Sequence, residues 1–333
     1  MPRRRLVLAS ALALPGLVLA GCSSAGADAD AGGAAEGSGF SIVASTSVYA
    51  SLVSELVGDA AEVTAIVDSP TQDPHSYEAT ARDQLAVQEA DLVVLNGGGY
   101  DPFMEQLADE AGVEHVITAV EYSHEYPGAE DEHAEDEHAE GEATEEAHDH
   151  EHEGHDHIEG FNEHVWYDPY AMADLVEALG AELGELLPDA GADIQASQED
   201  LLADIEGLEA SLEGIAADHG GAHAFFTEPV GGYLAEAAGL EDATAEGFAE
   251  AVEEGQDVPP ATLLAALDAI EGGEIDVLIT NTQTAGAETQ RVIDAAGEAG
   301  VPVVEYAETL PEGETYVSWM TANAEALEQA LAG

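Results

Sequence analysis

The sequence predicts an α/β protein with two Rossmann-like parallel-sheet lobes joined by one long helix. Short apolar segments alternate with segments of helical period in both halves of the chain, and this alternation is typical of parallel sheets. From residue 40 to residue 333 the chain is long enough for two domains of ordinary size. Between the two alternating regions, residues 192–217 carry apolar side chains at helical spacing, which predicts a single connecting helix over residues 190–219.

The N-terminal lobe is predicted over residues 40–189. Its expected elements are a strand at 40–44, a helix at 48–57, a strand at 62–67, a helix at 79–90, a strand, a turn, a helix and a strand within 90–119, and a helix at 171–187. The three glycines at residues 97–99 indicate a strand-to-helix turn and not a phosphate loop, because no lysine follows them.

The C-terminal lobe, predicted over residues 220–333, repeats this alternation. Its expected elements are a strand within 222–228, a helix within 230–239, a strand within 274–281, a helix within 285–300, a strand within 301–310 and a helix at 315–331. In open α/β sheets, ligands bind at the carboxyl ends of the strands. Candidate ligands are therefore sought in the loops that follow the strands.

The first 39 residues predict export and attachment to a membrane. Three arginines precede an apolar run that ends in Leu-Ala-Gly-Cys, which indicates a signal peptide at residues 1–21. The run is too short to span a bilayer comfortably, and its end resembles a bacterial lipobox, which implies lipidation of Cys22. The alternative is an ordinary signal peptide with an incidental cysteine. Cys22 is the only cysteine, so no disulfide can form within the chain, and residues 22–39 are expected to be a flexible tether.

The charge of the chain is strongly negative. It has 5 basic and 71 acidic residues, and three arginines leave with the signal peptide, so the mature chain stands at 2 − 71 = −69. Nucleic-acid binding needs clustered Lys and Arg and is excluded. Cations are the natural ligands of such a chain, although most of the acidity is expected to be solvated surface, as in an adaptation to salt.

An insertion at residues 122–159 has no apolar periodicity and is expected to be disordered. It holds eight of the 13 histidines of the chain. The alternative is an acidic spacer with incidental histidines, but this concentration favours weak collection of metal ions. The histidines expected to gather metal are His133, His138, His148, His150, His152, His155 and His157, with His124 at the start of the insertion.

Two further histidines lie in loops of the N-terminal lobe. His75 follows Asp73 and Pro74, and His164 stands among apolar and aromatic neighbours in NEHVWYDP. A lone loop histidine is usually a surface residue or a core residue bonded to the backbone. A buried neutral imidazole can instead bind a metal through one nitrogen and a carboxylate, such as that of Asp168, through the other.

These motifs resemble those of the zinc- and manganese-specific solute-binding lipoproteins of bacterial ABC importers. The resemblance rests on PHSYE, the His-rich insertion just ahead of NEHVWYDP, the long connecting helix and the segment before the last helix, and it covers nearly the whole mature chain. It implies two lobes joined by a rigid helix, with one metal ion held in the cleft between them by two ligands from each lobe. His75 and His164 match the two ligands of the N-terminal lobe.

The C-terminal lobe departs from the commonest zinc pattern of that family. Glu228 occupies the position of a third histidine, five residues before Tyr233. The fourth ligand of the family corresponds to a residue in the segment EYAETL, residues 305–310. Glu308 matches its position better, and Glu305 is the second candidate. His219 and His223 precede the strand and are expected at the wrong end of the sheet.

The resemblance also predicts the cargo and the partner. Two imidazoles and two carboxylates suit Mn2+ as well as Zn2+, but the His-rich insertion favours Zn2+. We therefore expect an extracytoplasmic, lipid-anchored monomer that delivers Zn2+ to an ABC permease, with Mn2+ as the alternative cargo. A zinc enzyme is disfavoured because the chain has no HExxH or GxSxG motif. A His-rich zinc buffer or adhesin remains the alternative from another class.

Overall fold

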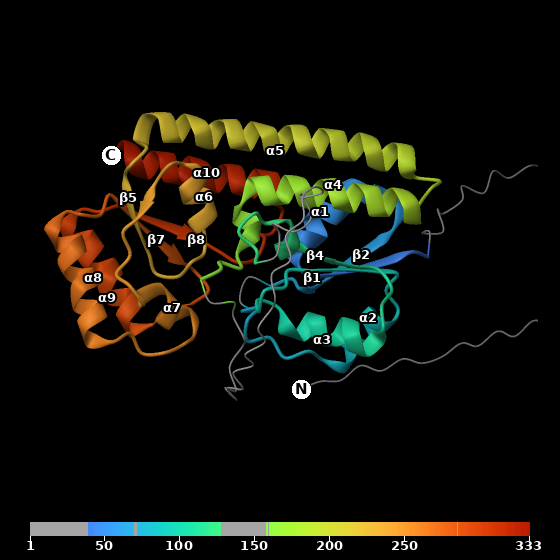
Figure 1. Cartoon of the computed structure of the whole chain (residues 1–333), viewed down its shortest axis with the longest axis horizontal. Coiled ribbons are helices and arrows are strands. Elements are labelled where there is room, and N and C mark those ends of the chain that lie inside the picture. The colour runs from blue at the N-terminus through green and yellow to red at the C-terminus, as the bar shows by residue number, and fades with distance from the viewer. Residues whose placement is uncertain (1–38, 70–71, 128–157, 159, 285) are drawn as a thin grey trace, which may run out of the picture. The chain divides into compact units, whose positions relative to one another are not determined.

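The computed structural model describes residues 39–69, 72–127, 158, 160–284 and 286–333 (Figure 1). The predictions for the signal peptide, the lipidated Cys22, the tether and most of the insertion concern residues outside this set. The same is true of seven predicted metal-gathering histidines, His133, His138, His148, His150, His152, His155 and His157.

The first half of the described chain forms a four-stranded parallel sheet in the order β2-β1-β3-β4. Its strands are β1 (Ser41–Thr46), β2 (Glu62–Val67), β3 (Leu92–Leu95) and β4 (Val116–Thr118). The central strands β1 and β3 are buried on both faces, which explains the uninterrupted apolar sequence of β3 (LVVL) and the apolar centre of β1 (IVA).

Helices cover both faces of this sheet (Figure 1). Alternate side chains of β1 point to opposite faces: Ile42 packs in the core that includes α1 (Ser47–Val57) and α4 (Pro169–Leu186), whereas Val43 packs with α2 (Ala81–Gln88) and α3 (Pro102–Ala111). Short 3-10 helices complete this half: η1 (Gly58–Ala60), η2 (Ala119–Tyr122) and η4 (Val165–Tyr167).

The second half repeats the topology with a parallel sheet in the order β6-β5-β7-β8. Its strands are β5 (His223–Phe226), β6 (Glu241–Asp242), β7 (Val277–Asn281) and β8 (Val303–Tyr306). Its helices are α6 (Gly232–Ala237), α7 (Phe248–Glu253), α8 (Pro260–Gly272), α9 (Ala287–Ala299) and α10 (Tyr316–Ala332). The elements β6, α7 and α8 were not among those expected from the sequence.

The long helix α5 (Gly191–His219) contacts elements of both halves. It packs against α1 and α4 of the first half and against α6 and α10 of the second. Its buried side chains recur at helical spacing, at Leu201, Ile205, Leu208, Leu212 and Ile215. One apolar core, which runs from Ile42 to Leu327, therefore includes residues of both sheets and of this helix. The predicted fold class, two parallel α/β lobes with a long helix between them, is confirmed.

Among the described residues, no helix has the length and apolar character needed to cross a membrane.

Candidate metal centre

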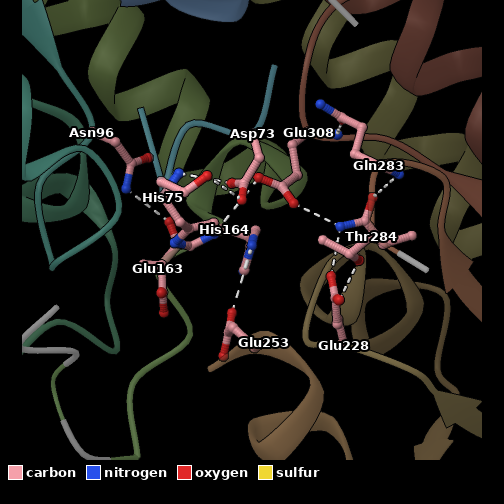
Figure 2. Close-up of polar contacts among 12 residues, drawn as sticks. Asp73, His75, Asn96, Glu163, His164, Glu228, Glu253, Gln283, Thr284 and Glu308 are labelled. Carbon is pink, nitrogen blue, oxygen red and sulfur yellow. Dashed lines mark hydrogen bonds and ion pairs between the residues drawn. The ribbon is translucent and has the colours of Figure 1, made fainter. Parts of the chain in front are cut away.

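Three of the four predicted ligands come together in a group that we call the inner cluster: His75, His164 and Glu308. One ligand atom of each lies within 4.8 Å of the others. His75 Nε2 is 3.6 Å from Glu308 Oε2, and the two imidazole centroids are 5.6 Å apart (Figure 2). The histidines follow β2 and β4, and the carboxylate follows β8, so the cluster forms where loops leave the carboxyl ends of strands.

The loop that carries His75 is fixed by Asp73. The backbone N–H of His75 donates to Asp73 Oδ1 at 2.9 Å, and the Ser76 hydroxyl donates to Asp73 Oδ2 at 2.8 Å. This is an Asx turn, in which a side chain satisfies the backbone two residues later. The imidazole then meets the buried ring of Tyr100 edge-on, with centroids 4.7 Å apart. These contacts orient the ring toward Glu308.

The imidazole of His164 is oriented by Asn162. Asn162 Oδ1 lies 2.8 Å from His164 Nδ1, and the Asn162 amide nitrogen donates to the Pro229 carbonyl at 3.1 Å. Because the amide nitrogen of Asn162 donates to Pro229, the atom of Asn162 that faces His164 Nδ1 is the oxygen Oδ1, which can only accept a hydrogen bond. His164 Nδ1 is therefore the donor and carries the proton. The lone pair is on Nε2, the atom that faces the carboxylates. The expectation that Asp168 supplies this contact is wrong: Asp168 instead caps α4 by accepting from the Tyr170 N–H at 3.0 Å.

Glu308 is the carboxylate of the inner cluster. Its Oε1 accepts from the Asn281 amide at 2.6 Å, and its backbone N–H donates to Gln283 Oε1 at 2.5 Å. Its Oε2 is buried and accepts no hydrogen bond of normal geometry from the residues that the structure describes. Burial, with the neighbouring carboxylate of Glu228, raises the pKa of Glu308 to about 8. The reserve candidate, Glu305, is exposed on β8 and stands apart from the cluster.

Glu228 lies beside the inner cluster and is not a member of it. Its Oε2 accepts from the Asn281 amide at 2.6 Å, and its Oε1 accepts from the Thr284 hydroxyl (Figure 2). Burial raises its pKa. The single amide group of Asn281 thus bonds both Glu228 and Glu308, and it holds the two carboxylates side by side.

Two further glutamates complete a second group, the outer cluster, formed by His75, Glu163 and Glu253. Their ligand atoms also lie within 4.8 Å of one another. Glu253 Oε1 is 3.8 Å from His164 Nε2, and burial together with nearby carboxylates raises the pKa of Glu253 to about 10. The sequence did not single out either glutamate. Glu163 stands next to His164 in the recognised motif, whereas nothing distinguishes Glu253 from the many acidic residues around it.

Four carboxylates meet here, of which those of Glu163, Glu228 and Glu308 are buried and that of Glu253 is partly buried, and no Lys or Arg of the described residues balances them. Arg82 on α2 and Arg291 on α9 are exposed, and the chain after Cys22 contains no other Lys or Arg. Moving an isolated, ionised carboxylate from water into a protein interior costs on the order of several kcal/mol, even after the protein has relaxed around it. Protons or a metal ion must therefore accompany these groups. Imidazole nitrogens among carboxylates are the ligands of a divalent transition metal.

The two histidines of the C-terminal lobe lie at the opposite end of their sheet. His219 is the last residue of α5, and His223 is the first residue of β5, where its Nδ1 lies 2.9 Å from the Glu274 carbonyl oxygen. Because the clusters form at the carboxyl ends of the strands, neither histidine belongs to them.

Comparisons with known proteins agree with this geometry. The family model for the zinc-uptake complex component A, periplasmic, matches residues 42–330. The manganese-binding lipoprotein MntA of Halalkalibacterium halodurans is 26% identical over 189 residues, which are 57% of this chain and 52% of the relative. A putative metal-binding protein of Thermotoga maritima is 36% identical over 72 residues, 22% of this chain and 27% of the relative. The chain therefore spans about half or less of the length of these curated relatives.

Solved structures share the fold at low sequence identity. The periplasmic zinc-binding protein TroA of Treponema pallidum has a TM-score of 0.68 at 19% identity, and the laminin-binding protein of Streptococcus agalactiae has a TM-score of 0.66 at 21% identity. Each likeness covers 88% of this chain and 99% of the other. Because the family model matches nearly the whole chain, the chain belongs to the zinc-uptake complex component A family, whose members are metal-binding receptors of ABC importers and not enzymes.

Proposed function

We propose that this protein captures Zn2+ outside the cytoplasm and delivers it to an ABC permease for import. The observation that carries the proposal is the inner cluster, in which a partly buried imidazole (His75), a buried imidazole (His164) and a buried carboxylate (Glu308) converge from loops of both halves. Among the described residues, no Lys or Arg accompanies them. His75, His164 and Glu308 bind the ion, and Glu228 is the fourth ligand. Glu228 stands next to the cluster through the shared amide of Asn281, and a change of rotamer would bring it to the ion.

The same proposal covers the parts of the chain outside the described residues. Export through the signal peptide and lipidation of Cys22 would keep the receptor, as a monomer, at the outer face of the membrane near its permease. The His-rich insertion would collect Zn2+ and pass it to the inner cluster, because imidazole-rich tracts bind Zn2+ more strongly than Mn2+.

Manganese is the second candidate cargo. Glu228 and Glu308 make half of the proposed ligand set carboxylates, and hard oxygen ligands suit Mn2+ better than they suit Zn2+. The printed names of the relatives include both metals: the protein of Treponema pallidum is called zinc-binding, and that of Halalkalibacterium halodurans is called manganese-binding.

The binding assignment is tested by calorimetry on a variant in which a short Gly/Ser linker replaces residues 130–155. This deletion spares the ends of the insertion, where Tyr126 packs on Phe161 with centroids 5.5 Å apart. We expect one tight site. We also expect the changes His75→Ala and His164→Ala together to raise its dissociation constant by more than about 100-fold, because removing a metal ligand weakens binding more than removing a residue that only orients a ligand.

The matched control is the pair His219→Ala and His223→Ala, which removes two histidines from the far end of the second sheet and should leave the tight site unchanged. If the linker variant binds no ion tightly, the protein is a His-rich buffer and not a receptor. If the His75 and His164 variant keeps full affinity, the ligand assignment is wrong.

A further inference from the structure

The outer cluster offers a second set of metal ligands beside the first. It combines one imidazole, His75, with the carboxylates of Glu163 and Glu253, and its ligand atoms lie as close together as those of the inner cluster. Glu163 comes from the first half of the chain and Glu253 from the end of α7 in the second half. One imidazole and two carboxylates from separate elements form a donor set that accepts a divalent transition metal.

The two clusters share a ligand and touch each other. His75 belongs to both, and Glu253 Oε1 lies 3.8 Å from His164 Nε2 of the inner cluster. Figure 2 shows Glu253 pointing from its helix toward His164, on the opposite side of that ring from Glu308. An ion bound by Glu253 would thus lie close to His164 and could reach it while it remains bound to His75.

Exposure to solvent differs between the clusters. The side chains of His164 and Glu308 are each 1% exposed, whereas those of His75 and Glu253 are each 11% exposed. The residual exposure belongs to His75, which both clusters share, and to Glu253, whereas Glu163 of the outer cluster is only 2% exposed. An ion that arrives from solvent meets His75 and Glu253 before it meets His164 and Glu308.

A purely structural role explains Glu253 poorly. It is the last residue of α7, where the partial negative charge of the helix end disfavours a carboxylate. Its Oε1 is buried and accepts no hydrogen bond of normal geometry from the described part of the chain. The carboxylate of Glu163 lies nearby and repels it. Either a proton on Glu253 or a bound cation is needed to make this arrangement of two acidic side chains favourable.

We propose that the outer cluster is a transient cation position through which the metal enters and leaves the inner cluster. This proposal rests on the proposed function as a metal receptor. The ion first binds His75, Glu163 and Glu253, and it then exchanges the two outer carboxylates for His164 and Glu308 while His75 stays bound. Stepwise exchange keeps the ion coordinated throughout, so it lowers the barrier in both directions and leaves the affinity of the final site almost unchanged.

The test measures rates and affinity with Co2+, whose visible absorption reports its coordination. Full-length protein loaded with Co2+ is mixed with excess EDTA, and the slow release phase is assigned to the inner cluster by its absence in the His164→Ala variant. For Glu253→Gln we expect the rates of Co2+ release from the inner cluster and of Co2+ uptake into it to fall by about tenfold. Charges that line a binding cleft change association rates by about this factor or more. The dissociation constant should change by less than about threefold. Glu163→Gln should behave in the same way.

The matched control is Glu250→Gln, which neutralises an exposed glutamate on the same helix and should leave the rates unchanged. Glu253→Gln would overturn the proposal if its rates equalled those of Glu250→Gln. Faster release with a weaker dissociation constant would also overturn it, because Glu253 would then be a permanent ligand or a simple source of attraction. A failure of the proposed receptor function gives a different result: if the inner cluster does not bind the metal, the His164→Ala variant will still show the slow phase of Co2+ release.

Discussion

The histidines of the inner cluster and the carboxylates opposite them are held in place by different means. Asp73 orients His75, and Asn162 orients His164, each across two residues of the chain. Glu228 and Glu308 instead depend on Asn281, which lies 53 and 27 residues away in sequence. The imidazoles are thus positioned by their own loops, whereas the carboxylates are positioned by the assembled sheet. A change to a local partner should disturb one ligand, and a change to Asn281 should disturb two.

The replacement Asn281→Ala tests the shared amide and should have the largest effect on affinity. It leaves two buried carboxylates facing each other without a common donor. We expect the dissociation constant for Zn2+ to rise by about 10- to 100-fold, and the free energy of unfolding of the metal-free protein to fall by about 1–3 kcal/mol. Chelator competition and urea unfolding measure the two effects.

Asn323→Ala serves as the control, because Asn323 is a buried asparagine of α10 that bonds neither carboxylate. It should lower stability without changing the dissociation constant. Equal affinities for the Asn281→Ala and Asn323→Ala variants would show that the amide does not organise the carboxylates.

The replacement Asn162→Ala tests the local partner and should have a smaller effect. Without Asn162 Oδ1, the proton of His164 is no longer held on Nδ1, and the ring loses its orientation. We expect a rise of about tenfold in the dissociation constant, measured by the same competition. Asn162→Asp should recover most of the affinity, since a carboxylate oxygen also accepts from Nδ1. No difference between the Ala and Asp variants would indicate that the tautomer is set elsewhere.

The pH dependence of stability distinguishes the buried carboxylates from the exposed ones. The pKa of Glu308 is about 8 in the folded, metal-free protein, against an ordinary value of 4.5. Between these values the folded state holds a proton that the unfolded chain lacks, so the free energy of unfolding should fall as pH rises from 5 to 8, by about 2–4 kcal/mol. Zn2+ needs the ionised carboxylate, so its affinity should change in the opposite sense and weaken as pH falls.

Urea unfolding at pH 5 and pH 8 checks this expectation. Glu308→Gln should show a smaller loss of stability over that range than the parent protein, because the general repulsion among surface carboxylates is the same in both. An identical loss in the two proteins would mean that Glu308 is ionised at pH 5. In the intact protein, ions held by the His-rich insertion should be released first as pH falls through about 6.5.

The parts of the fold that could be predicted are those with a repeating pattern in the local sequence. The alternation of strands and helices gave the two parallel lobes, and the apolar spacing of Leu201, Ile205 and Leu208 indicated the long helix. The short elements β6 and α7 escaped prediction because two to six residues carry no detectable period.

The same distinction applies to the site. His75 and His164 could be found because each lies in a recognisable motif with its own orienting residue nearby. Glu163 and Glu253 could not, because in a chain with 71 acidic residues no local feature separates a buried glutamate from a solvated one. Only packing brings Glu253 to His164. Glu228 could be named from the resemblance, but its bond to Asn281 and the position of Glu253 depend on contacts across the fold, which the sequence does not display.

The most direct test of the central claim is metal uptake by cells that carry or lack this protein, supplied with one metal at a time. Cells that lack it should lose high-affinity Zn2+ uptake, and a copy with His75→Ala and His164→Ala should not restore it, while Mn2+ uptake stays unchanged. The control copy with His219→Ala and His223→Ala should restore Zn2+ uptake in full. Loss of Mn2+ uptake with Zn2+ uptake unchanged would contradict the account and assign the protein to manganese.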